Sequence, residues 1–136
     1  MGDVAWRGDV RGGLPAAGLA ALLLAAGTTH LVAPKIYEGL IPRRLGNRRA
    51  WVLGSGVAEL ACGVAVAVPA TRSLGALASA ALFVAVFPGN VEMARTTRPG
   101  RGHGTLRTAV VWARLPLQVP LVGWALRVAS SSHRAA

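Results

Sequence analysis

The chain has 136 residues, of which 53% are hydrophobic and 15% charged, and its formal net charge is +10 at pH 7. A soluble domain would alternate apolar and charged residues along its helices, whereas here the charges gather between apolar blocks, as is typical of a polytopic membrane protein. The basic residues flank those blocks, so they indicate membrane loops, and we expect no nucleic-acid partner. The single cysteine, Cys62, excludes an internal disulfide, and we expect no metal site because candidate ligands are too few.

Four apolar stretches are long enough to cross a hydrocarbon core of roughly 30 Å. They cover residues 14–33, 51–69, 73–94 and 106–129. The first follows Arg7 and Arg11, as in a signal peptide, but its length predicts an uncleaved span. We therefore predict an all-α integral membrane protein, a four-helix antiparallel bundle that forms one transmembrane domain over residues 1–136. The ends, residues 1–12 and 130–136, are expected to be disordered.

The connection after the first span has its own apolar pattern. Ile36, Leu40, Ile41 and Leu45 recur at roughly helical spacing, and Pro42 breaks the run. This pattern predicts an interfacial or re-entrant segment at the membrane surface. The arginines that follow would then lie among anionic headgroups, so membrane lipids are expected partners.

The distribution of basic residues predicts the orientation in the membrane. With four spans, both termini and the short 70–72 turn share one side, and the two longer connections share the other. Nine basic residues fall on the loop side: Lys35, Arg43, Arg44, Arg48, Arg49, Arg95, Arg98, Arg101 and Arg107. Five fall on the terminal side: Arg7, Arg11, Arg72, Arg127 and Arg134. The excess predicts cytoplasmic long loops and external termini.

Two charges lie deep inside the spans. Glu59 is eight residues into the second span, and Arg114 is eight residues into the fourth, counted from the same membrane surface. A rise of 1.5 Å per residue places both about 12 Å deep, so an ion pair or a shared ligand is expected. A charge at that depth costs roughly 2.5–3.5 kcal/mol on insertion scales, and it rarely faces lipid. Two interpretations of Glu59 stay open: a hydrogen bond that joins two helices, or a functional acid.

Further polar residues cluster towards the loop side and predict a polar funnel that ends at Glu59 and Arg114. We expect the catalytic candidates to be Glu59, Arg114 and His30, and the ligand-binding candidates to be Tyr37, Asn90 and Gln118. Structural alternatives stay open for three of them: a helix-end hydrogen bond for His30, carbonyls freed by Pro88 for Asn90, and interfacial anchoring for Tyr37.

Four short motifs, one in or after each span, resemble the DoxX-like family of small four-helix membrane proteins. They are His30-x₃-Pro34-x₂-Tyr37-x₄-Pro42, Ser55-Gly56-x₂-Glu59-Leu60-x₂-Gly63, Ala85-Val86-Phe87-Pro88-x-Asn90 and Arg114-Leu115-Pro116-Leu117-Gln118. That family is mostly bacterial, so the resemblance implies a bacterial inner-membrane protein. The resemblance implies a link to membrane redox complexes, because the founding member is a subunit of a thiosulfate:quinone oxidoreductase and some relatives act as assembly factors. Cys62 stands alone and no haem-ligating His pair is visible, so the chain departs from the pattern of a redox catalyst.

Two function classes follow from these observations. The first is a non-catalytic subunit or assembly partner of a membrane complex, such as a quinone-linked redox complex, with a membrane-protein partner or a second copy of this chain. Its basis is the small-residue stripe formed by Ser55, Glu59 and Gly63, which allows close helix contact. The second is a small membrane enzyme that uses Glu59 and Arg114 for acid–base chemistry on a lipophilic quinone or isoprenoid substrate. No tightly bound cofactor is expected, and a quinone is the candidate ligand.

Overall fold

A computed structural model of the chain describes residues 3–98, 100, 102 and 104–134. Its regular elements in that part are all helices, without a β-strand, so the all-α prediction is confirmed. In chain order the elements are α1 (Asp3–Val32), α2 (Pro34–Glu38), the 3₁₀ turn η1 (Arg43–Leu45), α3 (Arg48–Ala67), the 3₁₀ turn η2 (Pro69–Thr71), α4 (Arg72–Thr96) and α5 (Thr105–Arg134).

Four of these helices are long and apolar enough to cross a membrane, as the sequence predicted. The candidate spans are Gly13–Val32, Arg48–Ala67, Pro69–Thr96 and Thr105–Arg134. They indicate a multi-pass membrane protein. Residues 3–12 and 130–134 were expected to be disordered, but α1 and α5 extend through them, whereas residues 1–2 and 135–136 lie outside the described part. At the end of α5, serine hydroxyls donate to carbonyls three or four residues back, which is compatible with a helix.

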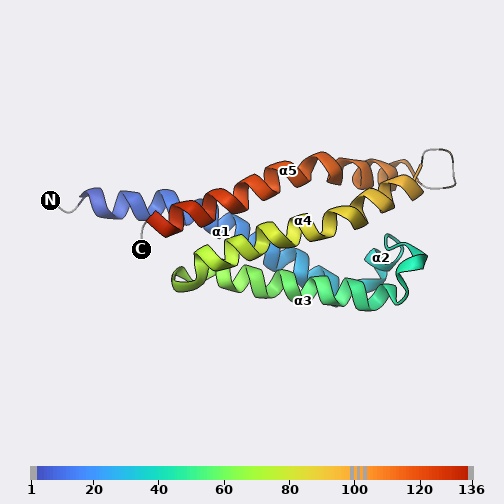
Figure 1. Cartoon of the computed structure of the whole chain (residues 1–136), viewed down its shortest axis with the longest axis horizontal. Coiled ribbons are helices and arrows are strands. Elements are labelled where there is room, and N and C mark those ends of the chain that lie inside the picture. Colours follow the sequence, from blue (N-terminus) through green and yellow to red (C-terminus); the bar gives the residue numbers. More distant parts are fainter. Residues whose placement is uncertain (1–2, 99, 101, 103, 135–136) are drawn as a thin grey trace.

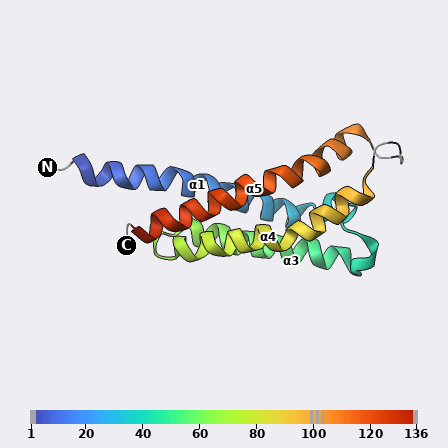
Figure 2. The same cartoon turned by 45° about the horizontal axis from the view of Figure 1, so that its top comes forward.

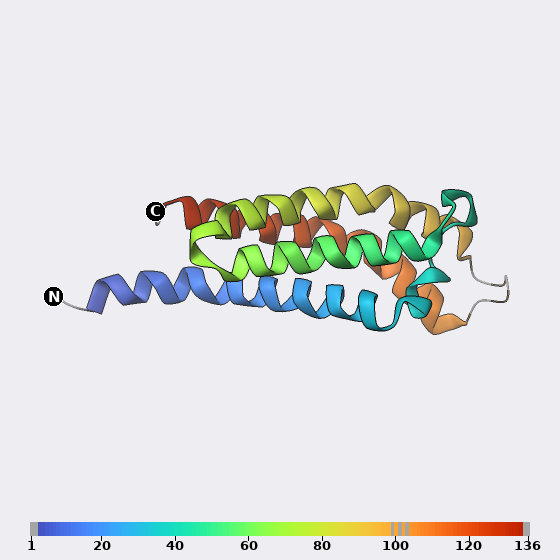
Figure 3. The ribbon, with the colours of Figure 1, turned by 90° about the horizontal axis from the view of Figure 1, so that it is seen from below.

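The four long helices lie side by side along the long axis of the molecule (Figures 1 and 3). The most extensive contacts join α1 to α3 and α4 to α5, and α3 packs on α4. A core of buried apolar side chains, among them Leu19, Leu23, Val66 and Val128, links α1, α3, α4 and α5. Trp124 Nε1 also donates to the carbonyl oxygen of Pro15 at 3.0 Å, which fixes α5 against α1.

Small residues let α1 and α3 approach each other closely. A Cβ atom on Gly27 would lie 2.7 Å from the carbonyl oxygen of Gly56, and one on Gly56 would lie 2.8 Å from the Cβ of His30. One on Gly63 would lie 2.8 Å from Leu24 Cγ. The small-residue stripe on α3 is therefore used inside the chain, against α1.

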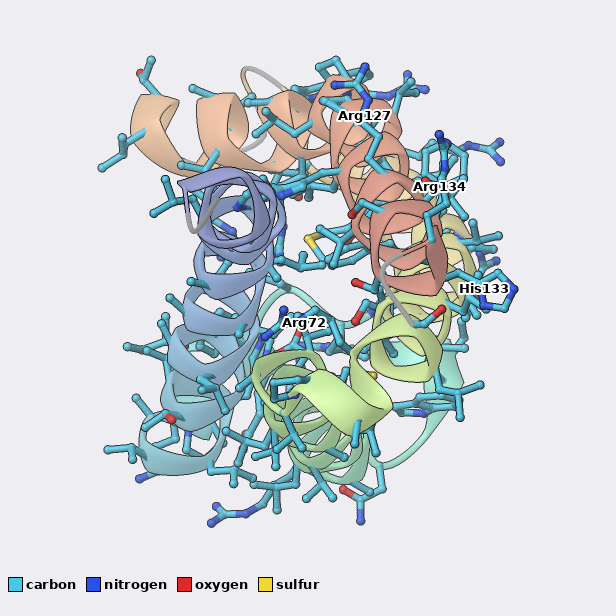
Figure 4. All side chains as sticks on the ribbon, turned by 90° about the vertical axis from the view of Figure 1, so that its left-hand side faces the viewer. Arg72, Arg127, His133 and Arg134 are labelled. Atoms are coloured by element: carbon cyan, nitrogen blue, oxygen red, sulfur yellow. The ribbon has the colours of Figure 1, made fainter. Side chains whose placement is uncertain are left out.

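The two ends of the molecule differ in what they carry. Both chain termini lie at one end, and α2 with the start of α5 lies at the other (Figures 1 and 2). At the terminal end Arg127, His133 and Arg134 belong to α5, and Arg72 lies at the turn between α3 and α4 (Figure 4). The Arg72 guanidinium donates to the carbonyl oxygens of Val66 and Ala67. These carbonyls lie at the end of α3, where no helical amide follows to bond them.

At the opposite end, two side chains fix the start of α3. The Asn47 side chain accepts a hydrogen bond from the Ala50 amide at 3.1 Å, as an N-cap residue does. Trp51 Nε1 donates to the carbonyl oxygen of Leu45 at 2.9 Å. These contacts hold the 39–47 connection against the helix, next to the cavities described below.

Candidate functional site

A cavity of about 290 Å³ lies at the α2 end and is lined by residues of α1, α2, α3, α4 and α5. Most of its wall is apolar, from side chains such as Val52, Val86 and Met93. The polar residues that line it are His30, Tyr37, Ser55, Glu59, Asn90 and Arg114. The structure thus brings five of the six candidate site residues to one cavity.

Glu59 interacts directly with His30. The distance from His30 Nδ1 to Glu59 Oε2 is 2.6 Å, and the two side chains are only 10% and 17% exposed. When Glu59 is ionised, Nδ1–H donates to the carboxylate, which fixes the imidazole tautomer and leaves Nε2 able to accept a proton. The close α1–α3 packing at Gly27 and Gly56 positions this pair.

Tyr37 on α2 holds the other side of the imidazole. Its ring meets that of His30 edge to face, with a centroid separation of 4.2 Å and an interplanar angle of 64°. The Tyr37 and Thr29 hydroxyls are 2.9 Å apart and share a hydrogen bond. His30 is therefore held between a carboxylate and an aromatic ring, and its orientation is restricted.

Arg114 lines the same cavity from α5, but it does not form the expected direct ion pair with Glu59. Among the described residues, the partner of Glu59 is His30. The physical reason is packing: α3 lies tightly on α1, whereas α5 packs mainly on α4. An interaction of Glu59 with Arg114 through a shared ligand stays a prediction.

Gln118 does not line this cavity. It is buried between α4 and α5, where it accepts a hydrogen bond from Asn90 Nδ2 at 3.3 Å and donates one to the carbonyl oxygen of Phe83. Phe83 lies next to Val84, whose carbonyl lacks its helical partner because Pro88 has no N–H. Asn90 thus has two roles. It lines the cavity, and its bond to Gln118 holds the amide that donates to the carbonyl oxygen of Phe83.

A second cavity, of about 490 Å³, adjoins the first and shares Leu40 and Ile41 with it. Its wall contains Arg43, Arg44, Arg48, Arg107, Glu92 and Thr96, among others. The sequence did not single out Arg107, because no spacing rule connects residue 107 with the 39–48 segment. The only available signal was its position at the loop end of the fourth span.

The remaining candidate groups of the described part of the chain form no further site. That part contains no cluster of three or more His, Cys, Asp or Glu residues that could hold a metal ion. Cys62 is partly buried and packs against the apolar core.

The fold and cavity define a helical, multi-pass membrane protein with a polar pair on the wall of an apolar cavity. Residues 19–129 match a family described as a domain of unknown function (DUF8561), and the chain belongs to that family. No curated protein and no solved structure matches the chain. The function is therefore argued from the site itself.

Proposed function

We propose that this protein binds a lipophilic small molecule of quinone or isoprenoid type in the cavity at Glu59 and transfers protons to or from it. The observation that carries the proposal is the His30–Glu59 pair, 2.6 Å apart, on the wall of a largely apolar cavity that Arg114 also lines. Apolar walls with a few converging polar groups are typical of small-molecule sites. An ionisable pair inside a membrane helix indicates function because it is costly to keep for packing alone.

The residues divide the chemistry between them. With Glu59 ionised and bonded to Nδ1–H, Nε2 of His30 accepts a proton from the ligand, and the carboxylate stabilises the imidazolium that results. The reverse transfer returns that proton to a ligand oxygen. While the ligand oxygen is deprotonated, Arg114 would stabilise the negative charge on it, because a guanidinium stays charged and donates several hydrogen bonds.

The membrane setting is part of the proposal. We place the four spans as an antiparallel bundle in the bacterial inner membrane, with residues 34–45 as an interfacial or re-entrant segment and the long loops in the cytoplasm. The cavity would then open at the cytoplasmic surface, where α2 lies. The DoxX-like resemblance supports a quinone as the ligand, because the motifs that carry it include His30, Tyr37, Glu59, Asn90 and Arg114.

The test is retention of a ligand by the full chain purified in a mild detergent. Native mass spectrometry should detect a bound lipophilic molecule, and both Glu59→Gln and Arg114→Gln should reduce its occupancy by about tenfold, since each removes a charge-assisted hydrogen bond. Glu38→Gln is the matched control, because Glu38 pairs with Arg49 and lines neither of the two cavities. Helical circular dichroism and a monodisperse gel-filtration peak establish that each variant is folded.

The proposal fails if the folded wild type carries no such molecule and also binds no added quinone or isoprenol. It fails equally if Glu59→Gln and Arg114→Gln retain as much ligand as Glu38→Gln. If ligand binding survives in Glu59→Gln while only stability falls, Glu59 is a structural hydrogen-bonding group.

A non-catalytic subunit or assembly partner is the second candidate function. What favours it is an apolar surface cavity of about 290 Å³ between α4 and α5, lined by Val84, Phe87, Val119 and Val122 together with Gln118. A partner helix could pack there. Stoichiometric copurification of one protein, abolished by Val119→Trp but not by Val110→Trp on the same helix, would support this function.

A further inference from the structure

The second cavity, which we call the arginine basin, is built from three separate parts of the chain. Arg43 and Arg44 come from the segment between α2 and α3, and Arg48 is the first residue of α3. Arg107 comes from α5, and Glu92 comes from the last turns of α4. The basin thus carries four guanidinium groups and one carboxylate. Its assembly from distant segments distinguishes it from a row of basic residues along one loop.

Only one of the four arginines is paired with an acid in the described part of the chain. Arg44 forms an ion pair with Glu92, whereas Arg43, Arg48 and Arg107 have no carboxylate partner there. Arg107 Nη2 donates to the carbonyl oxygen of Gly39 at 2.5 Å, which positions its guanidinium without neutralising it. Three like charges around one cavity repel each other, so the basin favours a multivalent anion.

The geometry of arginine points to a phosphate. Its planar group offers parallel N–H donors that match two phosphate oxygens, and several guanidiniums can share the three oxygens of one phosphate group. The basin also lies at the loop end of the spans, the depth at which lipid phosphates are found.

The apolar neighbour of the basin identifies the rest of the ligand. Leu40 and Ile41 line both cavities, so the arginine basin and the cavity of His30 and Glu59 adjoin at these two residues. A molecule that extends past Leu40 and Ile41 would place its charged end among the arginines and its hydrocarbon part among Trp51, Val52 and Met93.

We propose that the arginine basin binds the phosphate group of an amphiphilic lipid whose hydrocarbon part enters the adjoining cavity. For the hydrocarbon part this inference rests on the proposed function. It narrows the ligand from the quinone or isoprenoid type to an isoprenoid lipid phosphate, and it assigns Arg43, Arg48 and Arg107 as the residues that recognise the phosphate.

The experiment compares three probes on the full chain in detergent: a polyisoprenyl phosphate, the corresponding polyisoprenol, and inorganic pyrophosphate. Wild type should bind the lipid phosphate at least about tenfold more tightly than either of the others, because only the lipid phosphate occupies both cavities. The basin variant Arg43→Gln, Arg48→Gln, Arg107→Gln should lose this preference and still bind the polyisoprenol.

The control variant is Lys35→Gln, Arg95→Gln, Arg98→Gln, which removes the same charge from exposed positions at the same end, outside both cavities. It should keep the preference for the lipid phosphate. Equal losses in the basin and control variants would show general surface attraction and overturn the proposal. If the triple basin variant aggregates, the single change Arg48→Gln decides, with an expected loss of about threefold or more.

The other outcomes separate the two proposals. Pyrophosphate binding as tight as that of the lipid phosphate would mean a site for free anions and would overturn the lipid assignment. Equal affinity for polyisoprenol and its phosphate would overturn the basin's role but leave the proposed function intact. Wild type that binds neither lipid would overturn the lipid-phosphate proposal, and the proposed function would then require that an added quinone binds.

Discussion

Gln118 makes the two hydrogen bonds that join α4 and α5 below the cavity. It accepts from Asn90 and donates to the carbonyl oxygen of Phe83 while almost fully buried. The change Gln118→Leu would remove both hydrogen bonds and leave the Asn90 amide without this buried partner. We expect a loss of about 1–3 kcal/mol in the free energy of unfolding, measured by denaturation in detergent.

The control for that measurement is the preceding residue. Leu117 is 54% exposed, so Leu117→Ala should change stability little in comparison. A Gln118→Leu protein as stable as Leu117→Ala would mean that Asn90 and Phe83 find other partners, and that the two bonds do not stabilise the helix pair.

At the residue scale the sequence identified the unusual charges but not their pairing. Glu59 and Arg114 stood out because they interrupt apolar stretches, and both do line one cavity. The depth estimate treated the helices as straight, independent rods, so it paired Glu59 with Arg114 on equal depth alone. The observed partner, His30, is set by how closely α1 packs on α3 and by the rotation of each helix about its axis. Residue spacing along one sequence does not give that rotation.

The α1–α3 contact makes a sharp prediction at the scale of helices. A methyl group on Gly27 would meet the backbone oxygen of Gly56 at 2.7 Å, and backbone cannot move aside as a flexible side chain can. Gly27→Ala should therefore push the helices apart and lower the free energy of unfolding by about 1–3 kcal/mol. Because the same contact positions His30, ligand retention should fall as well.

Gly54→Ala on α3 is the matched comparison. A Cβ there would meet nothing within 4 Å, so the change should be neutral or stabilise the helix by about 0.5–1 kcal/mol through its better helix propensity. Thermal unfolding in detergent measures both variants. If Gly27→Ala proved as stable as Gly54→Ala, the close contact between α1 and α3 would be contradicted.

The element boundaries show what hydrophobic blocks can and cannot predict. Four apolar stretches predicted four helices of spanning length, and the structure has them. The helices run beyond the stretches at several ends, to Asp3 in α1 and to Arg134 in α5. Apolarity marks the part of a helix that is suited to hydrocarbon, whereas backbone hydrogen bonding can continue into polar residues. After residue 129 the serine hydroxyls fit into the helix because they bond to carbonyls three or four residues back.

For the whole molecule, fold class was the most predictable property, because only helices or closed barrels satisfy the backbone in lipid and the stretches had helical length. The second cavity was the least predictable. It depends on three segments meeting at the α2 end, Arg107 from α5 among them. Such meetings depend on tertiary packing, which composition and periodicity do not specify.

The orientation of the whole molecule gives the last prediction. By sequence, nine basic residues belong to the loop side and five to the terminal side, where the structure places Arg72, Arg127 and Arg134 (Figure 4). Cytoplasmic loops carry the excess of Lys and Arg, so the α2 end should face the cytoplasm and both termini should face outward. A reporter that works only outside the cytoplasm should then be active when fused after Ala136. A reporter that works only in the cytoplasm should be active when inserted at Gly104. Reversed activities would place the arginine basin at the external surface.

Arg127→Gln with Arg134→Gln should strengthen the predicted orientation, because the two changes lower the number of competing basic residues on the terminal side. A greater inverted fraction in that variant would show that features other than basic charge set the topology.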